Sequence, residues 1–413
     1  MTQGAPVNNS RADETLATGH PQENYRALEL VAYTLFAIGP MVGNGVLVML
    51  DAMASDFNVN PTDVMLAITA FMIPFAIVQL FSGAISDTKG RVPVLTLGIF
   101  IYLIAMLLQI FSTSLPMFIL ASVISGFGFG FVNPVLVALI TDGCSPSGIP
   151  KRMGIVGALA AISVGLGPAI AGQLVVFGWQ MFYAVFLVLS LLCLALLRLV
   201  KRPANKQSGR PAIGDLISNL SLELKRPVVL LLMLCIFAVG LSYSATIQWT
   251  SRGMAGVDEG MIGLLLLLTG IVGFVAGVSM NRIMGLRGIG TVIVLGLISL
   301  FTAVIILLLT GDLASPANLP LVAAALLIAG WAGGTLSPVL MTYSQILSPE
   351  RRGVLAGALT SSMFIGNALN VPIYSSIFAF GIQWVYTAIL IVAVALSILM
   401  MMLYRTAPRP STG

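Results

Sequence analysis

The sequence predicts an all-α polytopic membrane protein with twelve transmembrane helices in two six-helix bundles. Composition is the first reason: 58% of the 413 residues are hydrophobic and only 8% are charged, whereas soluble globular proteins carry roughly 25% charged residues. The second reason is that the apolar residues form long continuous runs, each near the roughly 20 residues that a helix needs to cross a hydrocarbon core. The third is the position of the lysines and arginines, which collect between alternate runs.

The apolar runs are continuous rather than alternating, which favours membrane helices over a β-barrel. Backbone amides in lipid must be satisfied internally, and a helix achieves this within one segment. Prolines inside the runs do not argue against helices, because membrane helices tolerate them. We expect spans near residues 28–50, 63–85, 92–112, 116–140, 152–177, 179–200, 227–250, 261–283, 288–310, 319–346, 353–380 and 382–404.

The basic residues predict the orientation of the chain. With the N-terminus in the cytoplasm, every one of the 20 Lys and Arg residues except Arg252 falls on the cytoplasmic side. Cytoplasmic loops carry an excess of positive charge, so we expect a multi-pass protein of the cell (inner or plasma) membrane with both termini in the cytoplasm. Omitting one span would scramble this asymmetry, which supports an even number of helices.

Polar stretches divide the chain into five parts. We expect a cytoplasmic N-terminal tail over residues 1–27, a first bundle over 28–200, a cytoplasmic linker over 201–226, a second bundle over 227–404 and a cytoplasmic tail over 405–413. The N-terminal tail lacks the apolar stretch of a signal peptide. Within the linker, the segment ISNLSLEL could form a short interfacial helix.

An internal repeat spans the linker. Residues 126–136 read GFGFGFVNPVL, residues 330–340 read GWAGGTLSPVL, and Lys151-Arg152 corresponds to Arg351-Arg352 further on. Both copies of the glycine-rich segment run from the outside to the inside, so the repeat is parallel. Two parallel repeats place a substrate path at their interface, near the middle of the bilayer. The alternating glycines of the first copy do not indicate dinucleotide binding, because no strand precedes them.

Residues 83–91, GAISDTKGR, end the second span and fill the short loop after it. Gly83, Asp87, Gly90 and Arg91 in this spacing resemble motif A of the major facilitator superfamily, a family of membrane transporters. Gly83 would let two helices approach closely, and Asp87 could pair with the basic residues of the loop. The resemblance implies that this charge network is a conformational switch that steadies the outward-open state. The alternative is an ordinary tight turn that carries orienting charges.

The fifth span carries a small-residue pattern similar to motif C, which the superfamily's antiporters and exporters contain. Small residues let this helix pack against a partner from the other half, and a Gly-Pro pair adds a kink. A generic packing face is the alternative. The pattern reads Gly154, Ser163, Gly167-Pro168 and Ala171-Gly172, with Ser and Ala in place of two of the family's glycines.

The segment upstream of motif A, which includes Phe71 and Gln79, resembles the drug:proton antiporters of the bicyclomycin-resistance type. Such proteins usually carry an acid in the first span and an arginine in the fourth. In this chain Asn44 takes the place of the acid and Ser122 that of the arginine. The two replacements are consistent with each other, because either charge alone in lipid would cost several kcal/mol.

Proton coupling would therefore need another acid. No predicted span has an acid at its centre; Glu29 lies at the inner edge of the first span, Asp142 at the inner end of the fourth, and Asp87 in motif A. We expect coupling at one of these three residues, or transport driven by the substrate gradient alone. For Glu29 the alternative is an interfacial residue whose carboxylate reaches the membrane surface.

By the same resemblance, spans one, four, seven and ten line the central cavity. Each polar or aromatic residue in them could contact substrate or hold two helices together, because a buried amide or hydroxyl in hydrocarbon needs a partner. As a set they predict a weakly polar, aromatic pocket without formal charge. They are Tyr33, Asn44, Ser122, Phe129, Asn133, Tyr243, Gln248, Trp331, Tyr343 and Gln345.

These observations predict a secondary transporter that exports drug-like or amphipathic molecules by alternating access. A facilitator or importer of a neutral metabolite is one alternative, and a non-transporting membrane sensor or assembly factor is another. We expect no enzymatic activity, cofactor, metal or nucleic acid, because the three cysteines are far apart and the basic residues are dispersed. The expected partners are a small-molecule substrate, the lipid bilayer and protons as the candidate coupling ion, and we expect a monomer.

Overall fold

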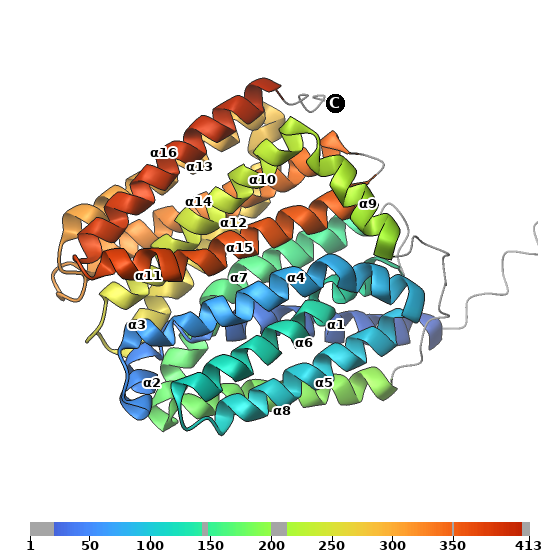
Figure 1. Cartoon of the computed structure of the whole chain (residues 1–413), viewed down its shortest axis with the longest axis horizontal. Helices are drawn as coiled ribbons and strands as arrows, with labels where there is room; N and C mark the ends of the chain where they lie inside the picture. The colour runs from blue at the N-terminus through green and yellow to red at the C-terminus, as the bar shows by residue number, and fades with distance from the viewer. Residues whose placement is uncertain (1–19, 143–147, 200–212, 349–350, 407–413) are drawn as a thin grey trace, which may run out of the picture.

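The structure is a computed structural model that describes residues 20–142, 148–199, 213–348 and 351–406, and this part of the chain is almost entirely helical (Figure 1). Residues 1–19 and 407–413 of the predicted tails and residues 201–212 of the predicted linker lie outside these ranges. The helices up to α8 form one half of the molecule and those from α10 onward form the other, side by side in Figure 1.

The first half begins with a long helix and ends with α8. Its connections are short, and glycines with positive φ make two of them: Gly90 (95°) follows α4 and Gly178 (97°) precedes α8. The helices are α1 His20–Gly45, α2 Leu50–Phe57, α3 Pro61–Val64, α4 Leu66–Lys89, α5 Arg91–Ile110, α6 Leu115–Asp142, α7 Ile149–Leu174 and α8 Trp179–Leu199.

The second half repeats this order after α9, Ile213–Leu224, which contains the predicted linker helix. Its first span is interrupted by a π-helical turn, Gly240–Ser244. The helices are α10 Pro227–Val239, α11 Ala245–Gly253, α12 Glu259–Arg287, α13 Ile289–Thr310, α14 Leu319–Leu347, α15 Arg352–Phe378 and α16 Ile382–Thr406.

The expected span count is confirmed in the described part of the chain. Eleven segments are long and apolar enough to cross a membrane, and α1 with α2 supplies a twelfth as a bent pair. The span expected near 28–50 is bent: α1 ends at Gly45 and meets α2 at 63°. Pro40 removes a helical hydrogen bond and Gly43 and Gly45 add flexibility just before the bend, which are ordinary causes of a broken helix.

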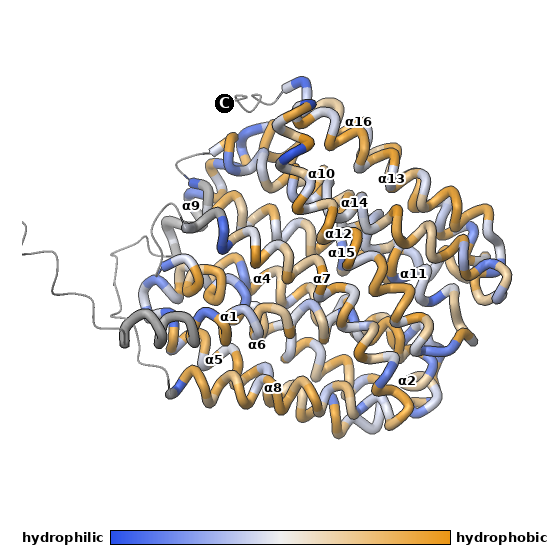
Figure 2. The backbone as a smooth tube through the Cα atoms, turned by 180° about the vertical axis from the view of Figure 1, so that it is seen from behind, coloured by the Kyte–Doolittle hydropathy of each residue, from blue (hydrophilic) through white to orange (hydrophobic). Residues whose placement is uncertain are grey.

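Polar residues gather at the two ends of the bundle and apolar residues cover its length (Figure 2). We call the end that holds the α4–α5 loop, with Lys89 and Arg91, the basic end. The opposite end holds α2, α3 and Arg252, and we call it the Arg252 end. Large apolar side chains on the outer helices, such as Leu192 and Ile391, are exposed, as expected for a surface in contact with lipid.

The two halves meet along two seams, where α7 packs on α12 and α4 packs on α15. The glycines of the sequence repeat set the packing inside each half. A Cβ on Gly126 of α6 would overlap the backbone of α4 at Phe71, and a Cβ on Gly330 of α14 would overlap that of α12 at Thr269. The fourth and tenth spans therefore pack on the second and eighth in the same way, which confirms a parallel structural repeat.

Candidate functional site

A cavity of about 900 Å³ lies between the two halves. Its wall comes from α1, α4, α6 and α7 of the first half and from α10, α11, α12, α14 and α15 of the second, together with the π-helical turn. It extends from Asn44 and Gln248, toward the Arg252 end, to the exposed Lys151 in the first turn of α7 at the basic end. A ligand in it would contact both halves at once.

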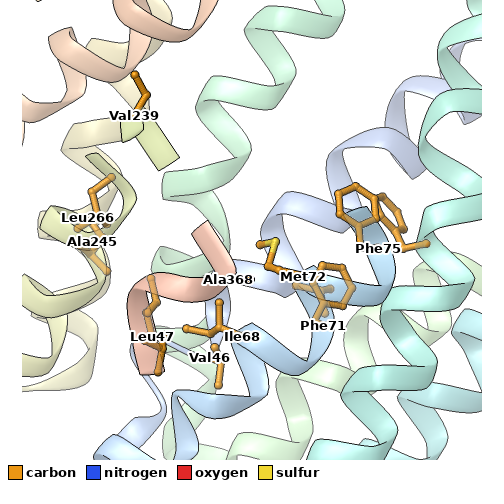
Figure 3. Close-up of a cluster of buried hydrophobic side chains, with 14 of the residues drawn as sticks. Val46, Leu47, Ile68, Phe71, Met72, Phe75, Val239, Ala245, Leu266 and Ala368 are labelled. Atoms are coloured by element: carbon orange, nitrogen blue, oxygen red, sulfur yellow. The ribbon is translucent and has the colours of Figure 1, made fainter. Parts of the chain in front are cut away.

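Aromatic rings form the first-half wall of the cavity. Phe71 and Phe75 on α4 stack with ring centroids 5.7 Å apart, and Phe75 lies 5.7 Å from Phe129 of α6. Phe75 also meets Phe364 of α15 edge to face at 4.7 Å, so the aromatic surface crosses to the second half. Figure 3 shows Phe71, Met72 and Phe75 along one side of α4. This surface suits flat or apolar groups, which aromatic rings bind by stacking and by burial.

Amide side chains form a polar cluster on the second-half wall. Gln248 Nε2 donates to Asn367 Oδ1 at 2.8 Å, and Asn370 Nδ2 donates to the Asn367 carbonyl at 2.7 Å. This arrangement leaves the buried atoms Gln248 Oε1 and Asn370 Oδ1 without a hydrogen-bond partner. Gln248 and Asn367 line the cavity. The cluster therefore offers hydrogen-bonding atoms without formal charge beside the cavity.

The π-helical turn lies beside this cluster. Gly240, Tyr243 and Ser244 of the turn line the cavity, and the carbonyl of Leu241 accepts a hydrogen bond of 3.2 Å from Tyr374 Oη on α15. A Cβ on Gly240 would overlap the backbone of α15 at Met363, so glycine is needed for this close approach. π turns are rare and concentrate at functional sites in proteins.

The cavity carries almost no formal charge. Lys151 is its one ionisable charged lining residue among those that the structure describes, and it lies at the mouth. The three acids considered for coupling do not line it. Each of them pairs with an arginine at the basic end: Glu29 with Arg152, and Asp87 and Asp142 with Arg91.

The residues predicted from spans one, four, seven and ten divide into two groups. Asn44, Phe129, Asn133, Tyr243 and Gln248 line the cavity. The other five lie outside its lining. Tyr33 donates to Glu29 Oε1 at 2.9 Å, Ser122 and Tyr343 are buried within their own halves, Gln345 is exposed and contacts Ser344, and Trp331 is half-buried on α14.

Much of the lining comes from helices outside that prediction. α4 and α15 supply aromatic and amide residues, including Phe71, Phe75 and Asn367, and α7 and α12 supply glycines and small apolar residues. The second and eighth spans border the cavity because they pack on the glycines of the fourth and tenth, a contact that only the structure shows. One lining residue did carry a signal in the sequence. Asn367 was an intramembrane amide, a residue type that marks helix contacts or a wet cavity.

Ser122, in the place of the family's arginine, belongs to a buried polar group in the first half. Gln109 Nε2 donates to Ser122 Oγ at 3.4 Å, and Ser122 Oγ donates to the Phe118 carbonyl at 2.9 Å. A void of about 20 Å³ adjoins Gln109, Ser122 and Ser125, large enough for one water molecule. This group is uncharged and separate from the central cavity.

Motif A forms a charge network at the basic end. Arg91 pairs with Asp87, donates to Ser86 Oγ at 2.6 Å and reaches Asp142 Oδ2 on α6 at 3.0 Å. These contacts join α4, α5 and α6 within the first half. They are present while the cavity is open at the basic end, so they do not act as the lock between halves that steadying the outward-open state would require. Gly83 has no heavy atom within 4 Å of its Cβ position, so the close helix approach expected there is absent in this conformation.

The glycines of motif C have two different surroundings. A Cβ on Gly167 would overlap α1 at Met41, and a Cβ on Gly172 would overlap α12 at Glu259, so these two residues lie at tight contacts on either side of Pro168. Gly154 has no atom within 4 Å of its Cβ position and instead lines the cavity. The motif therefore combines close packing toward the Arg252 end with open space toward the basic end.

Hydrogen bonds between the halves close the cavity at the Arg252 end. Ser251 Oγ on α11 donates to the Leu47 carbonyl at 2.6 Å, and Arg252 Nε donates to Thr62 Oγ1 at 3.0 Å. Thr69 Oγ1 of α4 donates to the Ala368 carbonyl of α15 at 2.7 Å. Figure 3 shows Leu47, Ile68 and Ala368 grouped beside these contacts. The cavity is therefore sealed at one end and reaches the surface at the other.

The linker helix is fixed to the second half by a buried carboxylate. Glu223 of α9 accepts from Arg226 at 2.9 Å and from Arg351 at 3.1 Å. Its side chain is 4% exposed, and burial raises the pKa of a carboxyl, yet hydrogen bonds from Ser348, Arg226 and Arg351 outweigh burial and hold the pKa of Glu223 below its ordinary value. The carboxylate therefore stays ionised and α9 stays attached to α15.

Comparisons with known proteins agree with this architecture. The sequence pattern of the Major Facilitator Superfamily matches residues 31–317. The chain is 28% identical over 352 residues to the uncharacterized MFS-type transporter YceJ of Bacillus subtilis (strain 168), covering 82% of this chain and 85% of that protein. It is 30% identical over 169 residues to multidrug resistance protein D of Escherichia coli (strain K12), covering 41% of this chain and 43% of the relative.

Two further matches extend the comparison. Multidrug resistance protein MdtL of Citrobacter koseri is 28% identical over 261 residues, covering 61% of this chain and 63% of that protein. The crystal structure of the nucleoside transporter NupG (D323A mutant) superposes with a TM-score of 0.72 over 92% of this chain and all of NupG, at 13% identity, which shows a shared fold. The match to the family covers more than half of the chain, and the family consists of transport proteins rather than enzymes. This chain belongs to the major facilitator superfamily of membrane transporters.

Proposed function

We propose that this transporter exports uncharged, drug-like or amphipathic molecules across the cell (inner or plasma) membrane by alternating access. The observation that carries the proposal is the cavity of about 900 Å³, which joins an aromatic wall to an amide cluster and has its one charged lining side chain at the mouth. A cavity without arginine or lysine at its centre does not suit a phosphate or dicarboxylate, whose charge needs such a partner. Its size fits a drug-like molecule.

Alternating access needs the closure at the Arg252 end to be reversible. The hydrogen bonds of Ser251 to Leu47, Arg252 to Thr62 and Thr69 to Ala368 join the halves there. Each contributes about 1 kcal/mol net, so a ligand that gains a few kcal/mol from contact with both halves can offset their loss. In this orientation the basic end faces the cytoplasm, as the distribution of Lys and Arg favours, and the structure corresponds to the state that loads substrate from inside.

The relatives named as multidrug resistance proteins support export as the direction. The coupling candidates are Glu29, Asp87 and Asp142, of which Glu29 is linked to the path through its partner Arg152, the residue after the cavity residue Lys151 on α7. A facilitator for a neutral metabolite is the second candidate function. It is favoured by one observation: each of these acids is paired with arginine and stands apart from the cavity lining.

The test is a screen of neutral amphipathic compounds by thermal shift in detergent, followed by transport of the best binder in proteoliposomes with and without an imposed pH gradient. Proton-driven export predicts accumulation against the substrate gradient only when the pH gradient is present. Transport that ignores the pH gradient would rule out proton antiport and establish the facilitator. A binder that is never transported would overturn both.

A further inference from the structure

The α7–α12 seam changes along its length. Toward the Arg252 end the two backbones touch: a Cβ on Gly165 would come within 2.8 Å of Leu267 Cα, and one on Gly263 within 2.6 Å of the Pro168 carbonyl oxygen. Toward the basic end they separate. Among the described residues, no heavy atom lies within 4 Å of the Cβ positions of Gly154 and Gly157, although α12 runs on to Arg287.

Where the helices separate, the same side chains belong to the cavity and to the outer surface. Ile155 of α7 and Phe274 and Val278 of α12 line the cavity, and they are 38%, 38% and 64% exposed. On α12, Ile271, Phe274, Val275 and Val278 follow helical spacing as one exposed apolar stripe, which is the pattern of a surface that faces lipid. The cavity therefore reaches the lipid-facing surface sideways, between the two helices.

The α4–α15 seam differs in the exposure of the residues that line the cavity. Thr69 bonds to Ala368 near one end, and Ser361 Oγ donates to the Ala76 carbonyl at 2.8 Å further along. The residues of α4 that line the cavity, such as Phe71 and Phe75, are buried, whereas its exposed residues Ile73 and Ile77 are not part of the lining. Gly83 of α4 and Gly357 of α15 also have open Cβ positions toward the basic end, but no described cavity-lining residue of α4 or α15 is exposed, whereas several of α7 and α12 are.

We propose that the separated part of the α7–α12 seam is a lateral opening through which amphipathic molecules dissolved in one bilayer leaflet reach the cavity. The occupant is a molecule with an acyl chain or apolar ring system and a hydrogen-bonding headgroup. Its apolar part passes between Ile155, Phe274 and Val278, where glycines leave room, and its headgroup stays near Lys151. A lysine in the first turn of a membrane helix places its ammonium at the headgroup level.

The lateral opening would serve the proposed transport function, and it rests on that function for its biological role. Its existence is tested separately, with a lipid probe and no transported substrate. The protein is reconstituted in vesicles of phosphatidylcholine that contain a phosphatidylcholine with a diazirine in its acyl chain. After irradiation, crosslinked residues are mapped by mass spectrometry. We expect crosslinks at cavity residues such as Met280 and Met341, in addition to the outer stripe of α12.

Two variants are designed to block the lateral opening between α7 and α12, and a third variant serves as a control that leaves this opening unblocked. Gly157→Trp and the smaller Gly154→Leu place their Cβ atoms where no heavy atom of the described residues lies within 4 Å, and a wild-type Tm in detergent checks that each variant is folded. Each is expected to lower the cavity crosslinks at least fivefold and leave the outer ones unchanged. Gly357→Trp, at the corresponding place on α15, also has open space but lies outside the cavity lining. It should behave as the wild type.

Crosslinks confined to the outer surface of the wild-type protein would overturn the lateral opening, as would cavity crosslinks that persist in both filled variants. The transport assay decides the other question separately. Cavity labelling together with an absence of transport in liposomes would leave the opening established and the proposed export function refuted.

Discussion

Arg152 of α7 holds Glu29 of α1 with two hydrogen bonds, Nε to Oε1 at 2.7 Å and Nη2 to Oε2 at 3.2 Å. Arg351, which corresponds to the neighbouring Lys151 in the sequence repeat, binds Glu223 of the linker helix α9, just before the first span of the second half. In each half an acid on the chain before or at the first span therefore pairs with an arginine at the start of the fifth. The two pairs are similar but not equivalent in the repeat, because Glu223 belongs to the linker helix and the two arginines are one position out of register.

Glu29→Gln should destabilise the folded protein, because Arg152 would lose its carboxylate partner while remaining about 20% exposed. We expect a loss of about 1–3 kcal/mol, seen as a lower Tm in detergent. The exchanged double variant, Glu29→Arg with Arg152→Glu, should recover part of the loss. An unchanged Tm in Glu29→Gln would contradict a structural role for this pair.

The Glu223 contacts predict a pH dependence of stability. Because the folded-state pKa is lowered from 4.5, the stabilisation is complete above about pH 4.5 and is lost as the pH falls through the lowered pKa. The difference in Tm between wild type and Glu223→Gln should be constant from pH 7 to 5 and shrink below pH 4. A difference that is the same at pH 3 and pH 7 would show that the carboxylate charge contributes nothing.

Asp87→Asn should impair transport and leave membrane insertion intact. Asp87 and Asp142 both pair with Arg91, so removal of one charge weakens the network that joins α4, α5 and α6. We expect at least a tenfold drop in the initial transport rate at equal protein content. Lys89→Gln, an exposed charge change in the same loop, is the control and should keep the wild-type rate. Full activity of Asp87→Asn would show that motif A has no switching role here.

Gln248→Leu should weaken ligand binding, because it removes an amide that lines the cavity and bonds to Asn367 at 2.8 Å. Loss of about 1–2 kcal/mol corresponds to roughly 5- to 30-fold in Kd, measured by titration of the best binder from the thermal-shift screen. Gln345→Leu, an exposed glutamine on α14 outside the lining, is the matched control. Equal Kd values for both variants would show that the amide cluster does not bind the ligand.

The sequence was sufficient to predict the spans and the parallel repeat, because continuous apolar runs and the repeated GFGFGFVNPVL and GWAGGTLSPVL segments are local signals. It did not predict which face of each span meets the cavity. α6 and α14 are apolar on all sides, so periodicity does not separate Asn133, which lines the cavity, from Ser122, which does not. Helix rotation is set by packing against neighbours distant in sequence.

The ion pairs and the bend in the first span could not be predicted from the sequence either, because they also depend on residues distant in sequence. Glu29 and Arg152 are 123 residues apart, so the sequence alone left Glu29 as a coupling residue or an interfacial one. Glycine is needed at position 45 because the ring of Phe182 on α8 occupies the space that a Cβ there would take. Such contacts exist only once the bundle has formed.

The central claim is that the two halves tilt about the cavity so that one end opens as the other closes. Double electron–electron resonance on spin labels at Thr113 and Ala317 reports the Arg252 end, and labels at Thr88 and Leu286 report the basic end; all four residues are exposed. Ser251→Ala removes one closing hydrogen bond worth about 1 kcal/mol and should raise the population open at the Arg252 end roughly fivefold. The account predicts that the 113–317 distance lengthens while the 88–286 distance shortens. Distances at both ends that stay fixed, or that lengthen together, would contradict it.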